Sequence, residues 1–144
     1  MRRTVRSLLE TKGHKIWSIQ PEMSVYHAIA TMAEHRCGSL VVLQDGKLVG
    51  IVTERDYARK VILEGRSSRD TPVSAIMTTV VHVVEPRETM EGCMELMTMC
   101  KVRHLPVMVE QRVVGVLSIG DVISALLYDR DSTIRDLEHY IVGG

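Results

Sequence analysis

The chain has 144 residues, 45% of them hydrophobic and 25% charged, which is typical of a soluble globular protein with one domain or two coupled halves. Its 18 Lys and Arg balance its 18 Asp and Glu, so it lacks the overall basic charge expected of a nucleic-acid binder. No apolar run approaches the roughly 20 residues that span a bilayer, so we expect no membrane partner. The basic N-terminus leads into no apolar segment, and the three cysteines show no Cys-x-x-Cys spacing. We therefore expect a cytoplasmic protein with reduced thiols.

The first half of the chain predicts helices alternating with short strands. Ser24 is suited to capping a helix, and an Asp-Gly turn at 45–46 separates two apolar runs as in a hairpin. In chain order we expect a helix at 2–12, a strand at 16–19, a helix at 25–35, strands at 38–43 and 48–52, and a helix from Thr53 to about Leu63.

The second half predicts the same order. We expect a strand at 80–84, a helix at 88–100, a hairpin of strands 104–109 and 113–117, and a helix from Ser118 to about Tyr128. A polar linker at 64–72 precedes one helical turn at 73–77, and the tail at 131–142 has the apolar spacing of an amphipathic helix. The predicted boundaries are a lead-in at 1–14, repeats at 15–64 and 80–130, a linker at 65–79 and a C-terminal helix at 131–144.

The two halves are copies of one unit, offset by 65 residues without a gap. Gly50, Thr53 and Asp56 recur as Gly115, Ser118 and Asp121. A fixed offset indicates a duplicated β-α-β-β-α unit, which alone buries too little apolar surface to be comfortably stable. We therefore predict an α/β (α+β) fold in which two copies pack sheet to sheet about a pseudo-twofold axis, with clefts between them suited to small ligands.

Each copy ends its most apolar stretch in Gly-x-x-Ser/Thr-x-x-Asp, and two interpretations of this motif stay open. Ser/Thr followed by an acid three residues later forms a capping box at a helix start. Alternatively, Asp56 and Asp121 accept hydrogen bonds from a ribose cis-diol, while Thr53 and Ser118 lie near a ligand oxygen. Two details favour binding: both acids are Asp rather than the Glu or Gln usual in capping boxes, and the preceding glycines allow a close approach to the backbone.

Arg55 is the charged residue that distinguishes the first motif from the second. A cation in the first helical turn opposes the helix dipole, which favours an anionic partner such as a nucleotide phosphate; the alternative, an exposed surface arginine, stays open. The matching residue, Gly120, carries no charge. We therefore expect the first site to bind phosphate more tightly by itself, and the second to need help from Arg103, His104 or Lys15.

These features together resemble a tandem pair of CBS domains (a Bateman module) over about residues 15–130. The resemblance rests on the repeat order, the paired motifs, the linker sequence Asp-Thr-Pro-Val-x-x-Ile-Met and the segment Arg-His-Leu-Pro-Val at 103–107. The last of these is similar to small stand-alone bacterial CBS-pair proteins. Members of the family commonly bind adenosine compounds between the repeats, although some bind nothing detectable. By this resemblance, the residues near the adenine are Lys15, Ser18, Gly38, Ser39, His82, Arg103 and His104.

The resulting hypothesis is a non-enzymatic sensor that binds an adenine nucleotide, with AMP as first choice and ADP, ATP or NAD as close alternatives. The leading rival is a ligand-free module that forms a homodimer or docks on an unknown effector protein. The residue pattern contains no paired-carboxylate or nucleophile signature and no zinc-ligand spacing among its six His, so we expect neither catalysis nor a metal. A catalytic role for His104 would require a positioned partner.

Overall fold

The structure is a computed structural model, and it describes residues 3–128. The elements before the linker are α1 (Val5–Lys12), β1 (Ser18–Ile19), α2 (Val25–His35), β2 (Ser39–Gln44), β3 (Lys47–Thr53), α3 (Glu54–Tyr57) and the π-helix η1 (Ala58–Ile62). They are followed by the 3₁₀-helix η2 (Val73–Ala75), α4 (Met90–Cys100), β4 (His104–Val109), β5 (Arg112–Ser118) and a helix at 119–128. The predicted tail helix at 131–142 lies outside the described residues.

The first repeat folds around a three-stranded sheet in the order β1-β2-β3. β1 runs parallel to β2, and β2 pairs antiparallel with β3, with Ser39 opposite Thr53. The hairpin turn places Asp45 at φ 53° and Gly46 at φ 78°, both left-handed, as the Asp-Gly sequence predicts for a tight hairpin. The predicted hairpin is therefore confirmed, and it sets Thr53 at the end of β3 where the chain enters α3.

The second repeat reproduces the hairpin in the same register but not its first strand. Gly115 pairs with Val107 as Gly50 pairs with Val42, and both hairpins have a bulge at the next position. The prediction of a strand over 80–84 is wrong, because only Val84 forms a bridge, to Val107. The residues before it lack ladder partners: Val80 is 75% exposed and borders a cleft.

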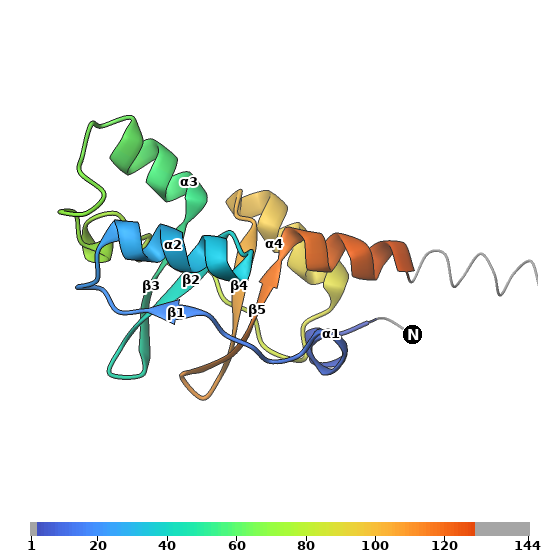
Figure 1. The fold of residues 1–144 in the computed structure, drawn as a ribbon. Helices are drawn as coiled ribbons and strands as arrows, with labels where there is room; N and C mark the ends of the chain where they lie inside the picture. Colours follow the sequence, from blue (N-terminus) through green and yellow to red (C-terminus); the bar gives the residue numbers. More distant parts are fainter. Residues whose placement is uncertain (1–2, 129–144) are drawn as a thin grey trace, which may run out of the picture.

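The segment that precedes each repeat packs into the core of the other one. Leu9 of α1 lies in a core cluster with Leu105 and Leu117 of the second repeat, and Ile76 after η2 lies in the core of the first. Figure 1 shows α1 next to the β4–β5 hairpin, far along the chain from its own position. The lead-in helix predicted at 2–12 is thus present as α1, and it ties the two repeats together.

This exchange also explains the two matched glycines. A Cβ at Gly50 would lie 2.8 Å from Met77 Sδ and 3.0 Å from the Thr78 carbonyl oxygen. A Cβ at Gly115 would lie 2.7 Å from Leu9 Cδ2. The close approach that the sequence assigned to a ligand is therefore made by the protein's own exchanged segments, and this argument for binding was wrong.

The helices after the two motifs differ in form. Thr53 caps α3 as predicted, but the chain continues from Ala58 to Ile62 as a π-helix, whereas residues 119–128 are α-helical. The fourth helix begins at Met90 rather than at Glu88, because Thr89 is its cap. Within residues 3–128, no helix is long and apolar enough to cross a membrane.

Candidate ligand-binding clefts

Two clefts lie where the repeats meet, and each draws residues from both. Cleft 1, of about 380 Å³, is lined by Gly38, Ile51, Thr53, Glu54, Arg55, Asp56, Thr78, Val80, Val81, His82, Lys101, Val102, Arg103 and His104. Cleft 2, of about 350 Å³, is lined by Lys12, Gly13, Lys15, Trp17, Arg36, Cys37, Gly38, Ser39, His104, Val116, Ser118 and Asp121.

The two clefts are related by the 65-residue offset. Thr53 and Asp56 in cleft 1 match Ser118 and Asp121 in cleft 2, and His82 matches Trp17. In each case one repeat supplies the hydroxyl–acid motif and the other supplies the opposite wall. The sequence repeat therefore produces two matched clefts, and their use as ligand sites stays a prediction.

In cleft 1, Thr53 and Asp56 form a complete capping box. The Asp56 amide donates to Thr53 Oγ1 at 3.1 Å, and Asp56 Oδ2 accepts from the Thr53 amide at 3.0 Å. Lys60, one turn further on, forms a 3.0 Å ion pair with Asp56 Oδ1. Asp56 is 8% exposed, so both its burial and its partners give it a structural role.

In cleft 2, Ser118 and Asp121 form the matching box. Asp121 Oδ2 accepts from the Ser118 amide at 2.8 Å, and the Asp121 amide donates to Ser118 Oγ at 3.1 Å. Lys12, from α1, donates to Asp121 Oδ2 at 2.6 Å and to the Val116 carbonyl at 2.8 Å. Burial alone would raise the pKa of the Asp121 carboxyl, but the bonds from Lys12 and Ser118 outweigh it and lower that pKa.

Both clefts carry cationic side chains on the wall opposite the acid. Arg36 and Lys101 are the matched C-caps of α2 and α4, with left-handed φ values of 53° and 55°. Arg55 lies instead on the same helix as Asp56; it is exposed and, within the described residues, makes one long hydrogen bond, 3.4 Å from Nη1 to the Lys101 carbonyl oxygen. Lys15 lies in cleft 2 with Arg36, and Arg103 lies in cleft 1. Because each cleft has cations suited to phosphate, the expected advantage of cleft 1 through Arg55 stays a prediction.

His104 and Gly38 border both clefts and so lie near the pseudo-twofold axis. The His104 ring lies close to Gly38: a Cβ on Gly38 would stand 3.5 Å from His104 Nε2. Burial lowers the pKa of the His104 imidazole, Arg103 and Lys12 lower it further, and Asp121 opposes them. The lowered pKa favours the neutral imidazole, which can accept as well as donate a hydrogen bond.

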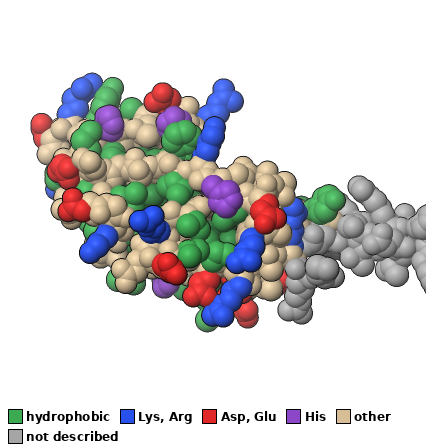
Figure 2. All heavy atoms as spheres, turned by 90° about the horizontal axis from the view of Figure 1, so that it is seen from below, with side chains coloured by type: hydrophobic (Ala, Val, Ile, Leu, Met, Phe, Trp, Pro, Cys, Tyr) green, Lys and Arg blue, Asp and Glu red, His purple; other side chains and the backbone are tan. Residues whose placement is uncertain are grey.

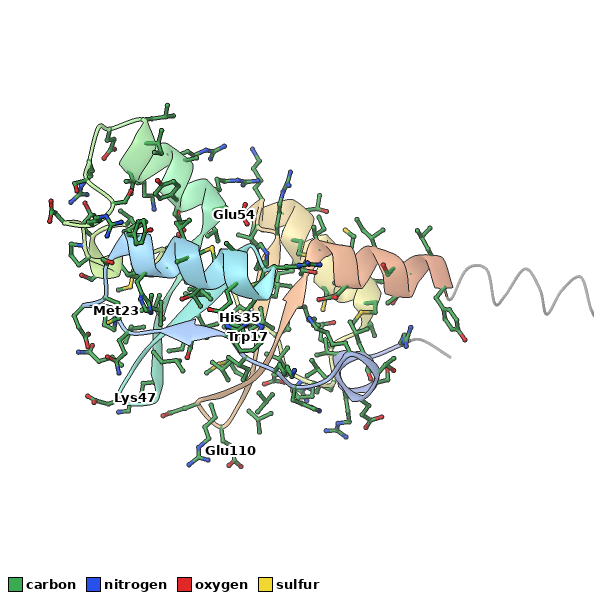
Figure 3. The ribbon with its side chains drawn as sticks, in the orientation of Figure 1. Trp17, Met23, His35, Lys47, Glu54 and Glu110 are labelled. Carbon is green, nitrogen blue, oxygen red and sulfur yellow. The ribbon has the colours of Figure 1, made fainter. Side chains whose placement is uncertain are left out.

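On the wall opposite the motif, Trp17 lines cleft 2 and His82 lines cleft 1, and each contacts a side chain behind it. Trp17 stacks on His35 with ring centroids 3.5 Å apart and planes 8° apart, as the labelled side chains in Figure 3 show. At the matching positions, His82 Nδ1 lies 3.6 Å from Cys100 Sγ. Trp17 is 36% exposed and offers cleft 2 a large indole surface, where cleft 1 has the smaller imidazole ring of His82.

The structure brings together most of the residues that the sequence singled out. Lys15, Gly38 and Ser39 line cleft 2, Arg103 lines cleft 1, and Ser18 lines neither cleft but a separate surface hollow. The sequence reasoning missed Lys12 and Thr78, because each is distant in the sequence from the acid that it contacts in the fold. Within the described residues, no group of three or more His, Cys, Asp or Glu is placed to hold a metal ion.

Comparison with known proteins decides the family. The CBS domain model matches residues 5–63 and 73–128, which are most of the chain. The protein belongs to the CBS-domain family. Both matched segments include one hairpin and one hydroxyl–acid motif, so the chain carries a CBS pair.

Individual relatives agree with this assignment. The chain is 37% identical to the mitochondrial CBS domain-containing protein CBSX3 of Arabidopsis thaliana, over 98% of this chain and 73% of that protein. A solved structure of a protein with CBS domains from Burkholderia ambifaria superimposes with a TM-score of 0.84 at 43% identity, covering 88% of this chain and 95% of that one. A hexameric CBS-CP12 protein from cyanobacteria has a TM-score of 0.77 at 25% identity, covering 85% and 71%.

Proposed function

We propose that this CBS pair is a regulatory module that binds an adenine ribonucleotide between its repeats, with AMP as first choice and ADP, ATP or NAD as alternatives. The observation that carries the proposal is the pair of symmetry-related clefts, each with a carboxylate and hydroxyl on one wall and cations on the other. Their volumes of about 350 and 380 Å³ fall within the range of small-molecule sites.

The chemistry of cleft 2 suits the parts of a nucleotide. Trp17 offers a π-surface to a base, Asp121 an acceptor to the ribose hydroxyls, and Lys15 and Arg36 charge to the phosphates. In cleft 1, Arg55, Lys101 and Arg103 supply the corresponding charge. A ligand in either cleft touches both repeats, so it would favour one relative orientation of the repeats over others.

We infer regulation rather than catalysis because the acidic side chains of the clefts are engaged in contacts with the protein and the cleft thiol is poorly suited to act as a nucleophile. The two acids are engaged in helix caps and lysine pairs. Burial raises the pKa of the Cys37 thiol in cleft 2, which reduces the fraction present as the nucleophilic thiolate. The relatives are likewise described as CBS domain-containing proteins rather than as enzymes. The proposed output is a change in the surface that the pair presents to an effector protein or a second copy.

A ligand-free interaction module is the second candidate, and two observations favour it. Both motifs form complete helix-capping contacts, which explain their residues without a ligand. Apolar side chains also stand exposed on or directly after the helices, with Leu63 at 78%, Met99 at 77% and Leu127 at 53%. These apolar side chains would suit the interface of a homodimer or of a complex with a partner protein. Nucleic acid is a poor candidate partner for the face seen in Figure 2, because basic and acidic side chains are interspersed there and form no extended basic surface.

A thermal-shift titration of nucleotide-stripped protein separates the two candidates. The compounds are AMP, ADP, ATP, NAD and S-adenosylmethionine, because a ligand bound only by the folded state raises its stability by mass action. We expect a saturable rise with at least one adenine ribonucleotide, weakened in Asp121→Asn and retained in Glu22→Gln, which removes an exposed carboxylate outside both clefts. No rise with any compound would refute the nucleotide proposal and favour the interaction module.

A further inference from the structure

The two motif acids differ in how much of their hydrogen-bonding capacity the protein uses. Asp56 Oδ2 accepts from the amide and the hydroxyl of Thr53 at 3.0 and 3.1 Å. Its Oδ1 accepts from Lys60 at 3.0 Å and from Thr78 at 3.4 Å. A carboxylate offers roughly four lone-pair positions, so the acid of cleft 1 is saturated. A sugar hydroxyl could reach it only by displacing a protein donor.

The acid of cleft 2 has an open oxygen. Asp121 Oδ2 accepts from the Ser118 amide and from Lys12, whereas Oδ1 has no hydrogen-bond partner within residues 3–128. The Asp121 side chain is 25% exposed, against 11% for Asp56. A ligand in cleft 2 therefore finds an accessible carboxylate oxygen, held in place by the partners of the other oxygen.

Lys12 adds a donor beside this acceptor. An ammonium group has three N–H donors. Lys12 uses two of them, one to Asp121 Oδ2 at 2.6 Å and one to the Val116 carbonyl oxygen at 2.8 Å. The third has no acceptor among the residues that the structure describes, and Lys12 lines cleft 2. Under the 65-residue offset Lys12 matches Met77, which has no N–H donor. The motif acid of cleft 1 also pairs with a lysine, Lys60, but Lys60 does not line that cleft, whereas Lys12 lines cleft 2.

We propose that the Lys12–Asp121 pair makes cleft 2 selective for ribonucleotides over 2′-deoxyribonucleotides, and that cleft 1 lacks this selectivity. A vicinal diol both donates and accepts hydrogen bonds. One hydroxyl donates to Asp121 Oδ1, and its neighbour accepts from Lys12. Removing the 2′-hydroxyl leaves one of these charged groups without its partner, which a site built for a hydroxyl discriminates against. This inference rests on the proposed nucleotide function. It assigns the selectivity of cleft 2 to Asp121 together with Lys12, which comes from α1, the helix that precedes the first repeat.

The sole tryptophan makes the test specific to one cleft. Trp17 is the single Trp of the chain and it lines cleft 2, so its fluorescence reports on that cleft. We would titrate the full chain with AMP against 2′-deoxy-AMP, and with ATP against 2′-deoxy-ATP. Because a hydrogen bond to a charged group is lost, the ribonucleotide should bind about tenfold tighter or more.

Two variants test the residues, and a third is the control. Lys12→Met, which installs the residue of the matching position, and the isosteric Asp121→Asn should each reduce this preference to about threefold or less. Lys47→Met removes a lysine at the tip of the β2–β3 hairpin, well apart from Trp17 in Figure 3, and should leave the preference unchanged. Urea denaturation would establish that each variant is folded.

Each unfavourable outcome has a distinct meaning. Equal affinity for the ribose and deoxyribose forms, or a preference that survives Lys12→Met and Asp121→Asn, would overturn this inference and leave the nucleotide function standing. Binding that leaves Trp17 fluorescence unchanged and is lost in Asp56→Asn would place the ligand in cleft 1 and also overturn it. No saturable binding by fluorescence or calorimetry would overturn both proposals.

Discussion

The exchange of α1 onto the second repeat can be tested by pairing a large-to-small change with a small-to-large one. Leu9 is 2% exposed, and truncation of such a side chain to Ala leaves a cavity that costs about 2–5 kcal/mol. Gly115→Ala would place a Cβ 2.7 Å from Leu9 Cδ2, and overpacking of this kind costs about 1–3 kcal/mol. In the double variant the new methyl group occupies space that Leu9 has vacated.

The two changes should therefore offset each other in part. We expect the double variant to be more stable than the sum of the single effects by about 1–2 kcal/mol, within the range measured for residues in contact. The assay is urea denaturation followed by circular dichroism, with a double-mutant cycle over the four proteins. Leu9→Ala combined with Gly50→Ala is the matched control, because Gly50 faces Met77 instead. Additive free energies for Leu9 and Gly115, or equal coupling in the control pair, would refute the exchanged packing.

Two further predictions concern the centre of the clefts and a cap. Because burial lowers the pKa of His104 below its unfolded value of about 6.5, the unfolded chain takes up this proton first on acidification. The contribution of neutral His104 to the free energy of unfolding is therefore present above the unfolded pKa. It is lost as the pH falls from that value toward the lower pKa of the folded state. The loss of urea stability from pH 7.5 to 5.5 should be smaller in His104→Gln, and an equal loss would contradict the assignment. Thr53→Ala removes the cap of α3 and should cost about 1 kcal/mol by the same assay, while Thr53→Ser should retain most of it; equal stability of both variants would exclude a capping role.

The features of the fold that repeat locally were readable from the sequence. The offset between Gly50 and Gly115 predicted two matching hairpins, because adjacent apolar runs, separated in the first copy by an Asp-Gly turn, favour local strand pairing. The first strand of the second copy was not predictable. Its valines favour a strand, but within residues 3–128 none of residues 80–83 forms a bridge to another strand.

The clefts were predictable in outline and not in detail. The hydroxyl–acid motifs predicted one wall of each cleft, because the repeated motif is visible directly in the sequence. The partners of the acids were not readable: Lys12 and Asp121 stand 109 residues apart, and their contact depends on α1 crossing to the other repeat. The sequence did carry one signal, the replacement of Lys12 by Met77 at the matched position, and it gains meaning only once the exchange is known.

A crystal structure of the protein grown with AMP or ATP tests the central claim most directly. The account predicts ligand density in cleft 2, with the ribose hydroxyls within about 3.2 Å of Asp121 and Lys12 and the base against Trp17. A nucleotide that occupied cleft 1 alone, or that lay on an outer helix face away from both motifs, would contradict it.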